Sequence, residues 1–429
     1  MQDPVRVGLL GCGNVGAPLV RLLDENADRI AARAGVAIEV TRVAVRDTGR
    51  RRDVKLSPDR FTTDAASVVA DPNVDVVVEV IGGLDPARRL ITEALEAGKP
   101  VVTANKELIA QHGPELFETA ARAGVDLLFE ASVAGGIPLM RPLRESLAGD
   151  RIHRVTGIVN GTTNFILTRM ADEGTSFADA LAEAQRLGYA EADPSADVDG
   201  LDAAAKAAII ATIAFGVRVH VEDVHTEGIT GITDDDMASA RVLGYVVKLV
   251  AVAEEVDGAV AVRVHPAMVP LHHPLAAVRD SFNAVLIEGE AVGELMLYGR
   301  GAGGGPSASA VLGDLIDAAH NLVSGAKGAT VGHLAASRVR PIGDLESQFY
   351  LLVEVADRPG VLAAIAQVFG DHGVSIQSME QRGLGSDARL VFVTHRARER
   401  DLRATVEALR GVEPVHRVGS VLRVMGDVG

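Results

Sequence analysis

Cysteine and tryptophan are nearly missing from this chain of 429 residues, which has one cysteine, Cys12, and no tryptophan. A single cysteine excludes an intrachain disulfide and a metal centre built from several thiolates, and it is typical of proteins in a reducing compartment. Aromatic residues make up only 3% of the chain. A base-stacking surface for single-stranded nucleic acid is therefore not expected.

Basic residues are outnumbered as well: 42 Lys and Arg stand against 58 Asp and Glu, a formal charge of −16. Such a chain repels nucleic-acid phosphate, and the basic run 50–52 is too short for a duplex-binding face. No signal-peptide pattern precedes the first strand-like segment, and Lys206 interrupts the most apolar stretch, 203–219. We expect a cytoplasmic protein that binds neither nucleic acid nor membranes.

Short runs rich in Val and Ile alternate with amphipathic segments through the first 135 residues, which predicts a parallel sheet with helices on both faces. The expected strands are 5–10, 36–45, 74–81, 101–105 and 125–132. The expected helices are 15–33, 86–98 and 107–123. We predict an α/β fold that begins with an NAD(P)-binding Rossmann domain over residues 1–135.

Longer strands mixed with helices follow, which is typical of an α+β domain, and we assign residues 136–325 to substrate binding and catalysis. Strands are expected at 151–160, 261–270 and 283–299, and helices at 176–188, 200–215 and 311–323, the last returning to the first domain. Residues 326–346 have little periodicity and are interpreted as a linker. The order β-α-β-β-α-β over residues 347–429 predicts a ferredoxin-like domain.

A glycine-rich turn, GCGNVG, directly follows the first expected strand and precedes a helix. Its glycines allow a tight turn and a close approach of a pyrophosphate to the helix N-terminus, as in dinucleotide-binding domains. We predict that Gly11, Gly13, Asn14, Val15 and Gly16 contact a nicotinamide coenzyme.

The choice of coenzyme depends on the segment after the second strand, which reads VAVRDTGRRR. Arg46 can pair with the 2′-phosphate of NADP(H), whereas Asp47 can accept the ribose hydroxyls of NAD(H). A solvated basic loop fits the same residues. NADP(H) is the predicted coenzyme, with NAD(H) as the alternative.

Two lysines are candidate catalytic residues. Lys106 follows a sheet strand at the edge where ligands of open α/β sheets bind, and Lys206 opens an Ala/Ile run. Asp202 precedes Lys206 by four residues, so the two share one face of a helix. A lysine flanked by acids can give a proton to a carbonyl being reduced. Surface ion pairs are the alternative for both lysines.

Five acids precede Lys206: Glu191, Asp193, Asp197, Asp199 and Asp202. Their number indicates a site for a substrate that carries an ammonium group. Helix capping or turn formation is an equal alternative for Asp193 and Asp199.

Two further segments indicate ligand sites. In FEASVAGGIP (129–138), oxygen atoms of Glu130, Val133, Gly135 and Ile137 can hold a hard cation, although a tight crossover needs the same glycines.

In the C-terminal domain, Pro359 and Gly360 open a helix directly after a strand. N–H groups near Val361 and Leu362 can therefore meet a carboxylate, and Asp357 can take an ammonium group. An amino acid is the predicted ligand, and a domain that serves only for dimerisation is the alternative.

Taken together, these segments resemble homoserine dehydrogenase, in the monofunctional form that carries a C-terminal regulatory ACT domain. The similarity covers nearly the whole chain, and its most specific parts are VNGTTNFIL and the block from Glu191 to Lys206. The motifs that carry it are GCGNVG (11–16), TANKELIA (103–110), EASVAGGIP (130–138), VNGTTNFIL (159–167), GYAEADPSADVDGLDAAAK (188–206), GAGGGPSASA (301–310) and DRPGVLA (357–363).

The resemblance implies reversible NAD(P)-dependent interconversion of L-aspartate 4-semialdehyde and L-homoserine, in the biosynthesis of threonine, methionine and isoleucine. It implies that Lys206 is the proton donor and that Lys106 touches both coenzyme and substrate. Gly305 joins the coenzyme site, and the substrate site comprises Gly188, Glu191, Asp197 and Asp202. The resemblance also implies a sodium ion at Glu130, Val133, Gly135 and Ile137, L-threonine as the effector, and a dimer or dimer of dimers formed through the substrate domain.

Three other functions fit parts of the sequence. A phosphorylating semialdehyde dehydrogenase needs a cysteine nucleophile, and Cys12 lies inside the phosphate-binding turn. A 2-hydroxy-acid dehydrogenase needs a histidine beside a guanidinium, and no such pair stands out in residues 136–325. A catalytically idle amino-acid sensor is the remaining alternative, although the intact set of Glu191, Asp202 and Lys206 argues against it.

Overall fold

A computed structural model describes residues 3–336, 338–383 and 388–426. The chain folds into two compact units. Unit 1 comprises residues 1–155, 205–222 and 283–337, and unit 2 comprises residues 156–204, 223–282 and 338–429. The boundaries pass through strand β7 (Ile152–Ile158) and helix α9 (Leu201–Phe215).

A six-stranded parallel sheet forms the centre of unit 1, in the order β3-β2-β1-β4-β5-β6. Its strands are β1 (Val5–Leu10), β2 (Ile38–Ala44), β3 (Phe61–Thr62), β4 (Val76–Glu79), β5 (Val101–Thr103) and β6 (Leu127–Leu128). The strand order reverses between β1 and β4, and ligands of such sheets bind at the carboxyl ends of the strands beside this point. The predicted Rossmann-type sheet is confirmed.

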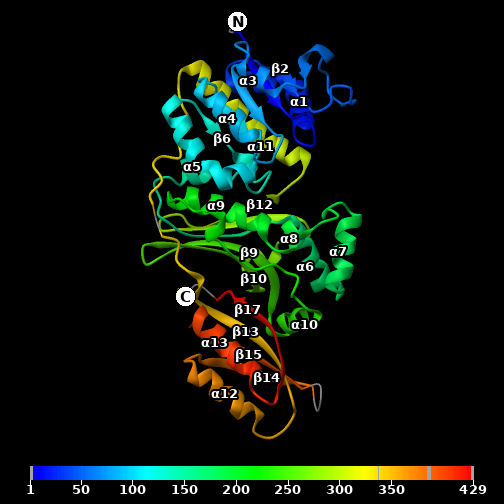
Figure 1. The fold of residues 1–429 in the computed structure, drawn as a ribbon, viewed down its shortest axis with the longest axis vertical. Coiled ribbons are helices and arrows are strands. Elements are labelled where there is room, and N and C mark those ends of the chain that lie inside the picture. The colour runs from blue at the N-terminus through cyan, green and yellow to red at the C-terminus, as the bar shows by residue number, and fades with distance from the viewer. Residues whose placement is uncertain (1–2, 337, 384–387, 427–429) are drawn as a thin grey trace. The chain divides into compact units, whose positions relative to one another are not determined.

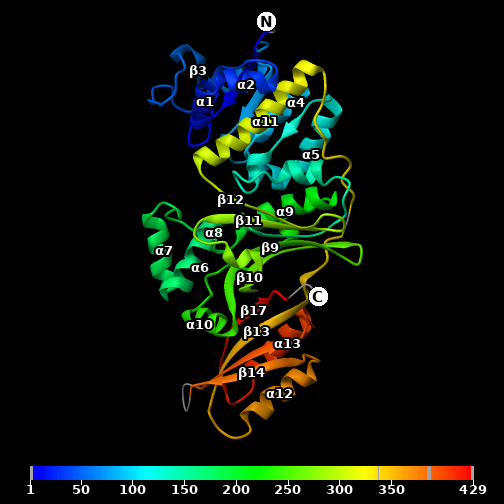
Figure 2. The ribbon, with the colours of Figure 1, turned by 180° about the vertical axis from the view of Figure 1, so that it is seen from behind.

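Helices cover both faces of this sheet (Figures 1 and 2). They are α1 (Gly16–Glu25), α2 (Ala27–Ala34), α3 (Ala65–Ala70), α4 (Ala87–Glu96), α5 (Lys106–Ala123) and α11 (Gly304–Ser324). Although α11 comes late in the sequence, its residues Val311 and Leu315 are buried in the same core as Leu9 and Leu19. Unit 1 also contains the strands β11 (Phe282–Gly289) and β12 (Gly293–Arg300).

Unit 2 begins with helices and a long antiparallel hairpin. These elements are α6 (Gly161–Glu173), α7 (Phe177–Arg186), α8 (Ser195–Val198), β8 (His225–Thr226), α10 (Asp234–Leu243), β9 (Tyr245–Val256) and β10 (Ala259–Pro270). The side chains of β9 and β10 are buried along most of their length, so this hairpin is the core of the mixed α+β region.

The rest of unit 2 is the ferredoxin-like domain, with the strand order β17-β13-β15-β14. Its elements are β13 (Glu346–Val355), α12 (Val361–Asp371), β14 (Ile376–Arg382), β15 (Ala388–Thr394), β16 (Ala397–Arg398), α13 (Glu399–Arg410) and β17 (Val415–Val424). Strand β17 also pairs in parallel with β10, so the sheet continues from this domain into the hairpin.

Several element boundaries differ from the expected ones. The helix expected over 15–33 is two helices, because the backbone leaves helical geometry at Asn26, where both the backbone N–H and the side-chain amide donate to the carbonyl of Leu22. The strand expected over 283–299 is the hairpin β11–β12, which turns before Gly293, and α11 begins at Gly304 rather than at 311. Helix α6 and strand β9 were not predicted.

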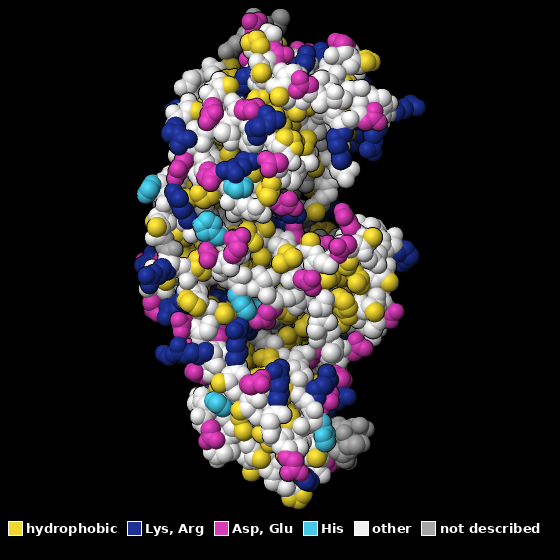
Figure 3. Space-filling model, viewed as in Figure 1, with side chains coloured by type: hydrophobic (Ala, Val, Ile, Leu, Met, Phe, Trp, Pro, Cys, Tyr) yellow, Lys and Arg dark blue, Asp and Glu magenta, His cyan; other side chains and the backbone are white. Residues whose placement is uncertain are grey.

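Acidic and basic side chains are interspersed over the face of the protein shown in Figure 3. Among the described residues, no helix is long and apolar enough to cross a membrane. The apolar stretch noted in the sequence forms helix α9, and most of its alanine and isoleucine side chains are buried.

Candidate active site

The turn between β1 and α1 needs a glycine at two of its three glycine positions. Gly11 has a φ of +101°, and a Cβ at Gly16 would lie 2.1 Å from the carbonyl oxygen of Gly11. By contrast, a Cβ at Gly13 would meet nothing within 4 Å, so the backbone there is open to an approaching ligand. A glycine-rich turn at the N-terminus of a helix suits an anionic pyrophosphate.

The start of α11 closes one side of this turn. A Cβ at Gly304 would lie 2.2 Å from the carbonyl oxygen of Asn14, so α11 packs directly against the turn. Gly305 is exposed in the first turn of α11, and Val15 immediately precedes α1. The predicted coenzyme residues Asn14 and Val15 belong to this turn, and Gly305 follows the residue that packs against it.

Cys12 lies within the same turn and is only 6% exposed. Burial raises the pKa of its thiol, although Arg52 and Arg21 oppose this effect. A buried thiol with a raised pKa is a poor nucleophile, which argues against thioester chemistry at this cysteine.

The loop after β2 carries a basic residue that was not singled out from the sequence, Arg52. Its guanidinium donates to the carbonyl of Cys12 at 3.3 Å and to that of Asp47 at 2.8 Å, and it lies over the ring of Phe61. Arg46 and Asp47 are exposed, and the Asp47 carboxylate accepts the N–H of Gly49 at 2.8 Å. Arg52 thus ties this loop to the glycine-rich turn, and the run RRR was the signal for it.

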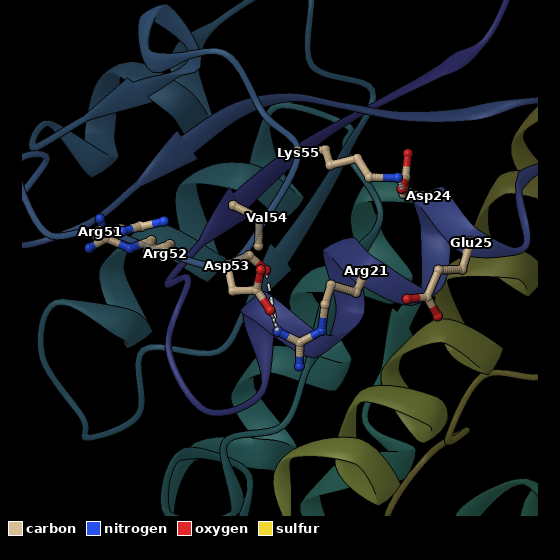
Figure 4. Close-up of a pocket in the computed structure, with 8 residues that line it drawn as sticks. All are labelled: Arg21, Asp24, Glu25, Arg51, Arg52, Asp53, Val54 and Lys55. Carbon is tan, nitrogen blue, oxygen red and sulfur yellow. Dashed lines mark hydrogen bonds and ion pairs between the residues drawn. The ribbon is translucent and has the colours of Figure 1, made fainter.

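A cavity of about 690 Å³ opens beside this loop (Figure 4). It is lined by four basic residues, three acids and a valine: Arg21, Arg51, Arg52, Lys55, Asp24, Glu25, Asp53 and Val54. Arg21 pairs with Asp53 and Lys55 with Asp24, whereas the side chains of Arg51 and Arg52 lie together at one end in Figure 4. This end of the cavity is suited to a phosphate group.

Glu79, at the end of β4, is a second residue that the sequence reasoning missed. It is fully buried, and its carboxylate accepts the hydroxyl of Thr103 at 2.6 Å and the N–H groups of the turn that follows β4. Thr103 accepts the N–H of Asn105, and the Asn105 side chain donates to the carbonyl of Gly83. This chain of hydrogen bonds fixes the start of α5, where Lys106 is the first residue.

Lys206 lies inside α9, one helical turn after Asp202. The lysine is 8% exposed and the aspartate 9%, so both charged groups are removed from bulk water. Alanine and isoleucine make up most of the helix after Lys206. A buried lysine of this kind is commonly retained for chemistry or for a buried ion pair, because its desolvation is costly.

Asn160, the N-cap of α6, organises the acids that precede Lys206. Its side-chain N–H group donates to Asp197 at 2.7 Å and to Asp202 at 2.9 Å. Its oxygen accepts the N–H of Thr163, which fixes the orientation of the amide. We call residues 191–202 the acid segment. Asp197 and Asp202, both predicted substrate residues, are thus brought together by a residue that was predicted only as part of a motif.

The other acids of the segment have different surroundings. Asp193 accepts the N–H and hydroxyl of Ser195, and these hydrogen bonds lower the pKa of its carboxyl, so the turn interpretation fits it. Glu191 and Gly188 are exposed. Asp199 ends α8. Of the predicted substrate residues, Glu191 at the start of the acid segment and Gly188 just before it are therefore solvent-exposed.

The predicted cation site contains a carboxylate that is already hydrogen-bonded. Glu130 is 5% exposed, and its carboxylate accepts the backbone N–H groups of Leu139, Met140 and Arg141 at 2.5–2.8 Å. Its own N–H donates to Asp314, and burial raises the pKa of Asp314 to about 7. Among the described residues, no group of three or more His, Cys, Asp or Glu side chains can hold a metal.

The backbone after Glu130 makes a tight, left-handed turn. Ala134 and Gly135 are both left-handed, with φ of 56° and 54°, and a Cβ at Gly135 would lie 2.3 Å from the carbonyl oxygen of Gly301. Val133 and Ile137 are buried on either side of this turn. Buried carbonyl oxygens in a tight turn fit the preference of a hard cation for oxygen ligands.

The predicted effector residues lie at the start of α12. Gly360 is the N-cap, with a φ of 92°, and Asp357 accepts the side-chain amide of Gln381 at 3.2 Å. The N–H of Val361 points back to the carbonyl of Arg358 at 3.4 Å, and Leu362 is 43% exposed. This helix N-terminus is accessible to solvent.

Family models match three parts of the chain. The model for the NAD-binding domain of homoserine dehydrogenase matches residues 11–130, that for homoserine dehydrogenase matches residues 138–316, and that for the ACT domain matches residues 349–414. The homoserine dehydrogenase of Corynebacterium glutamicum is 48% identical over 428 residues, which is 99% of this chain and 96% of that protein. The chain belongs to the homoserine dehydrogenase family.

Other relatives agree with this assignment. The homoserine dehydrogenase of Mycobacterium tuberculosis is 49% identical over 99% of this chain and 98% of its own. The crystal structure of a homoserine dehydrogenase from Thiobacillus denitrificans has a TM-score of 0.92 at 40% identity, with 99% of both chains covered. A hyperthermophilic archaeal homoserine dehydrogenase in complex with NADPH has a TM-score of 0.63 at 31% identity, over 73% of this chain and 97% of that one.

Homoserine dehydrogenases are oxidoreductases, and this member has all three of the expected parts: the coenzyme-binding sheet, the mixed substrate region and the C-terminal ACT domain. The ferredoxin-like domain is therefore called the ACT domain below.

Proposed function

We propose that this homoserine dehydrogenase interconverts L-homoserine and L-aspartate 4-semialdehyde with NADP(H), as a step toward threonine, methionine and isoleucine. The observation that carries the proposal is the cluster of Asp197 and Asp202 on the amide of Asn160, directly before the buried Lys206. Such a cluster suits a small substrate with an ammonium group at one end and a reacting oxygen at the other.

Each residue has a distinct role in this proposal. Asp202 and Glu191 hold the substrate ammonium group, and Asp197 and Gly188 shape the same site. A bound nicotinamide coenzyme would supply the hydride chemistry at the carbon that bears the reacting oxygen. Lys206 Nζ takes the hydroxyl proton during oxidation and gives it back during reduction, and Lys106 helps to stabilise the charge on that oxygen.

The preference for NADP(H) rests on the basic loop after β2. Arg46 is exposed, and Arg51 and Arg52 lie at one end of the adjoining cavity, so several guanidinium groups can meet a 2′-phosphate. Asp47, the residue that favours NAD(H), already uses its carboxylate to hold the N–H of Gly49.

A monovalent cation such as sodium is proposed at the turn after Glu130, with the carbonyls of Glu130, Val133, Gly135 and Ile137 as ligands. It would fix the backbone between the coenzyme sheet and the residues that follow it. Thermal unfolding in sodium chloride and in choline chloride at equal ionic strength tests this site: a higher midpoint in sodium supports it, and equal midpoints contradict it.

L-Threonine is proposed as the effector, with its carboxylate at the N–H groups near Val361 and Leu362 beyond Gly360, and its ammonium group at Asp357. A dimer, or a dimer of dimers, is the proposed assembly. Isothermal calorimetry with L-threonine tests the first proposal, and sedimentation equilibrium tests the second.

Absorbance at 340 nm tests the reaction itself. We expect loss of absorbance when the protein meets NADPH and aspartate semialdehyde, and gain when it meets NADP and homoserine. Lys206→Ala should lower turnover by roughly 10²–10⁴-fold, the usual contribution of a general acid or base, with nearly unchanged NADPH binding. Lys206→Arg is the control, because it keeps the charge but cannot release its proton. No absorbance change in the wild type would favour the idle sensor instead.

A further inference from the structure

The ACT domain joins the rest of unit 2 at the end of its last strand. Arg423 of β17 is paired with Ala267 of β10, and Val424 with Met268, in a parallel arrangement. The N–H of Met425 continues this ladder by donating to the carbonyl of Met268 at 2.9 Å. The side chain of Arg423 is therefore placed where the two parts of the sheet meet.

Arg423 is bound on two sides. Its guanidinium donates to both carboxylate oxygens of Glu227, at 2.8 and 2.9 Å, and to both oxygens of Glu399, at 2.5 and 2.9 Å. Glu399 belongs to α13 of the ACT domain, whereas Glu227 follows β8 of the substrate region. The Arg423 side chain is 7% exposed and that of Glu399 3%, whereas the side chain of Glu227 is 37% exposed. The guanidinium is therefore desolvated, and it joins a buried carboxylate of the ACT domain to a half-buried one of the other region.

Glu227 is fixed by more than Arg423. Its carboxylate lies 2.6 Å from His225 Nε2, and its backbone N–H donates to the carbonyl of Val264 in β10. Burial opposes its ionisation, but the hydrogen bonds from His225 and Arg423 outweigh burial and hold the pKa of Glu227 far below its usual range. The side chain is thus an anion held in one position.

The residues after Glu227 pack against the acid segment. A Cβ at Gly228 would lie 2.2 Å from the carbonyl oxygen of Val198 and 2.6 Å from Cα of Asp199. The N–H of Ile229 donates to the same Val198 carbonyl at 2.8 Å. A shift of Glu227 would therefore move the backbone that contacts residues 198 and 199.

Gly200 adds a second contact between the same two stretches. It has a φ of +84°, and a Cβ there would come within 3.1–3.4 Å of Thr226, of the Glu227 carbonyl and of Val264. Asp197 and Asp202, which share the amide of Asn160, lie on either side of this contact. Gly228, which follows Glu227, contacts Val198, and Val198 is next to the proposed substrate residue Asp197. One backbone contact therefore connects Glu227 with a proposed substrate carboxylate.

We propose that Glu227, held by Arg423 of the ACT domain, is a positioning residue for the acid segment, and that this pair is the path by which the ACT domain influences substrate binding. The inference rests on the proposed role of Asp197 and Asp202 in binding homoserine. An ACT domain that draws Arg423 away from Glu227 displaces residues 227–229 and, with them, the backbone next to Asp197. Substrate affinity then changes without any change at the coenzyme turn.

Steady-state kinetics of three full-length variants test this proposal. Arg423→Met, Glu227→Gln and Gly228→Ala should each raise the KM for homoserine by about 2- to 30-fold, the range for residues that couple two sites. The KM for NADP and kcat should change less than about twofold. The matched control is Arg417→Met, which breaks a pair with Glu354 at 2.7 Å on the same strand β17, among exposed side chains.

A second measurement keeps the test independent of the reaction. Amide hydrogen exchange in residues 194–200 should become faster in Arg423→Met and Glu227→Gln, and should stay unchanged in Arg417→Met. Folded Arg423→Met and Glu227→Gln proteins with wild-type KM for homoserine and wild-type exchange would overturn the proposal. If the wild type does not oxidise homoserine, the proposed function fails, while the exchange experiment still decides whether Glu227 positions the segment. If Arg423→Met does not fold, Glu227→Gln and Gly228→Ala decide.

Discussion

Asn160 is the residue on which the proposed substrate site depends most. Both of its amide functions are used: the N–H group holds two carboxylates, and the oxygen caps α6 through Thr163. Two carboxylates that lie together repel each other unless a donor is shared between them or a cation is bound. An amide donor makes the pair stable in the empty enzyme and leaves room for a substrate ammonium group.

Asn160→Asp separates these two functions. The new carboxylate still accepts the N–H of Thr163, but it adds a third negative charge beside Asp197 and Asp202. We expect kcat/KM for homoserine to fall by about 10- to 100-fold, as hydrogen bonds to charged groups contribute about 1.5–3 kcal/mol. Thermal unfolding serves as the control for helix capping. A kcat/KM within twofold of the wild type would contradict the role of the amide.

Lys248 of β9 should make the free energy of unfolding depend on pH. It is 4% exposed, and its ammonium group donates to the side chain of Asn164 and to the carbonyl of Val278. Burial, assisted by the charge of Arg279, lowers the pKa of this lysine to about 8. Between this value and the unfolded value of about 10.4, the unfolded chain binds more protons than the native one, so stability rises with pH.

Lys248→Met should remove this dependence. From about pH 7.5 to about pH 9.5, the free energy of unfolding of the wild type should gain about 2 kcal/mol relative to this variant. Urea unfolding at the two pH values measures the difference, with the exposed Lys327→Met as the control. An identical pH dependence in the wild type and in Lys248→Met would show that the buried amine does not titrate in this range.

At this scale, the sequence pointed to the right kinds of residue more often than to their partners. The spacing of Asp202 and Lys206 predicted that the two share one face of a helix, and both lie in α9, where they are buried. Asn160 and Glu79 were missed, because each acts through residues 24–42 positions away, and no local pattern marks such pairs. For Glu130, the bonds to backbone N–H groups at 139–141 could not be read from spacing.

The elements of the coenzyme unit follow local chemistry closely, and the exceptions have local causes. Strands of Val and Ile between turn residues are buried on both faces, so their hydrophobic runs are continuous and easy to recognise. Helix α11 was predicted to start late because its first turns are rich in glycine and serine, which favour loops in isolation. Packing against Asn14 overrides that preference. Helix α6 was missed for a similar reason: its first turn, GTTN, has low helix propensity and depends on the cap by Asn160.

The loop after β2 is the element that should decide coenzyme preference. Arg46→Ala should raise the KM for NADPH about 10-fold or more and leave that for NADH nearly unchanged, because only NADPH has a 2′-phosphate to pair. Arg52→Ala should raise both values, since Arg52 also ties the loop to the turn through Cys12 and Asp47. Parallel assays with both coenzymes make the comparison, with Arg50→Ala as the control. Equal effects of Arg46→Ala on both coenzymes would show that Arg46 only supports the loop.

On the scale of the whole molecule, the order of the parts along the chain could be predicted from the sequence. The strand pairing that joins the ACT domain to β10 could not. The change from β-α-β repeats to longer strands, and then to a separate β-α-β-β-α-β pattern, predicted three parts. The paired residues of β17 and β10 lie 156 positions apart in sequence, and there are only two such pairs. Nothing in the sequence around Arg423 distinguishes a strand that stays within its own sheet from one that extends into another.

This connection changes what removal of the ACT domain is expected to do. A chain that ends at residue 345 loses β17, so the Ala267–Met268 edge of β10 is unpaired and Glu227 is left without Arg423. We therefore expect the truncated enzyme to lack the proposed response to L-threonine and also to show a raised KM for homoserine. Full-length Asp357→Ala, which keeps β17 and Arg423 in place, should lose the threonine response alone. Initial rates at several homoserine concentrations, with and without threonine, separate the two effects. A truncated enzyme with the wild-type KM for homoserine would show that the ACT domain regulates the site without supporting it.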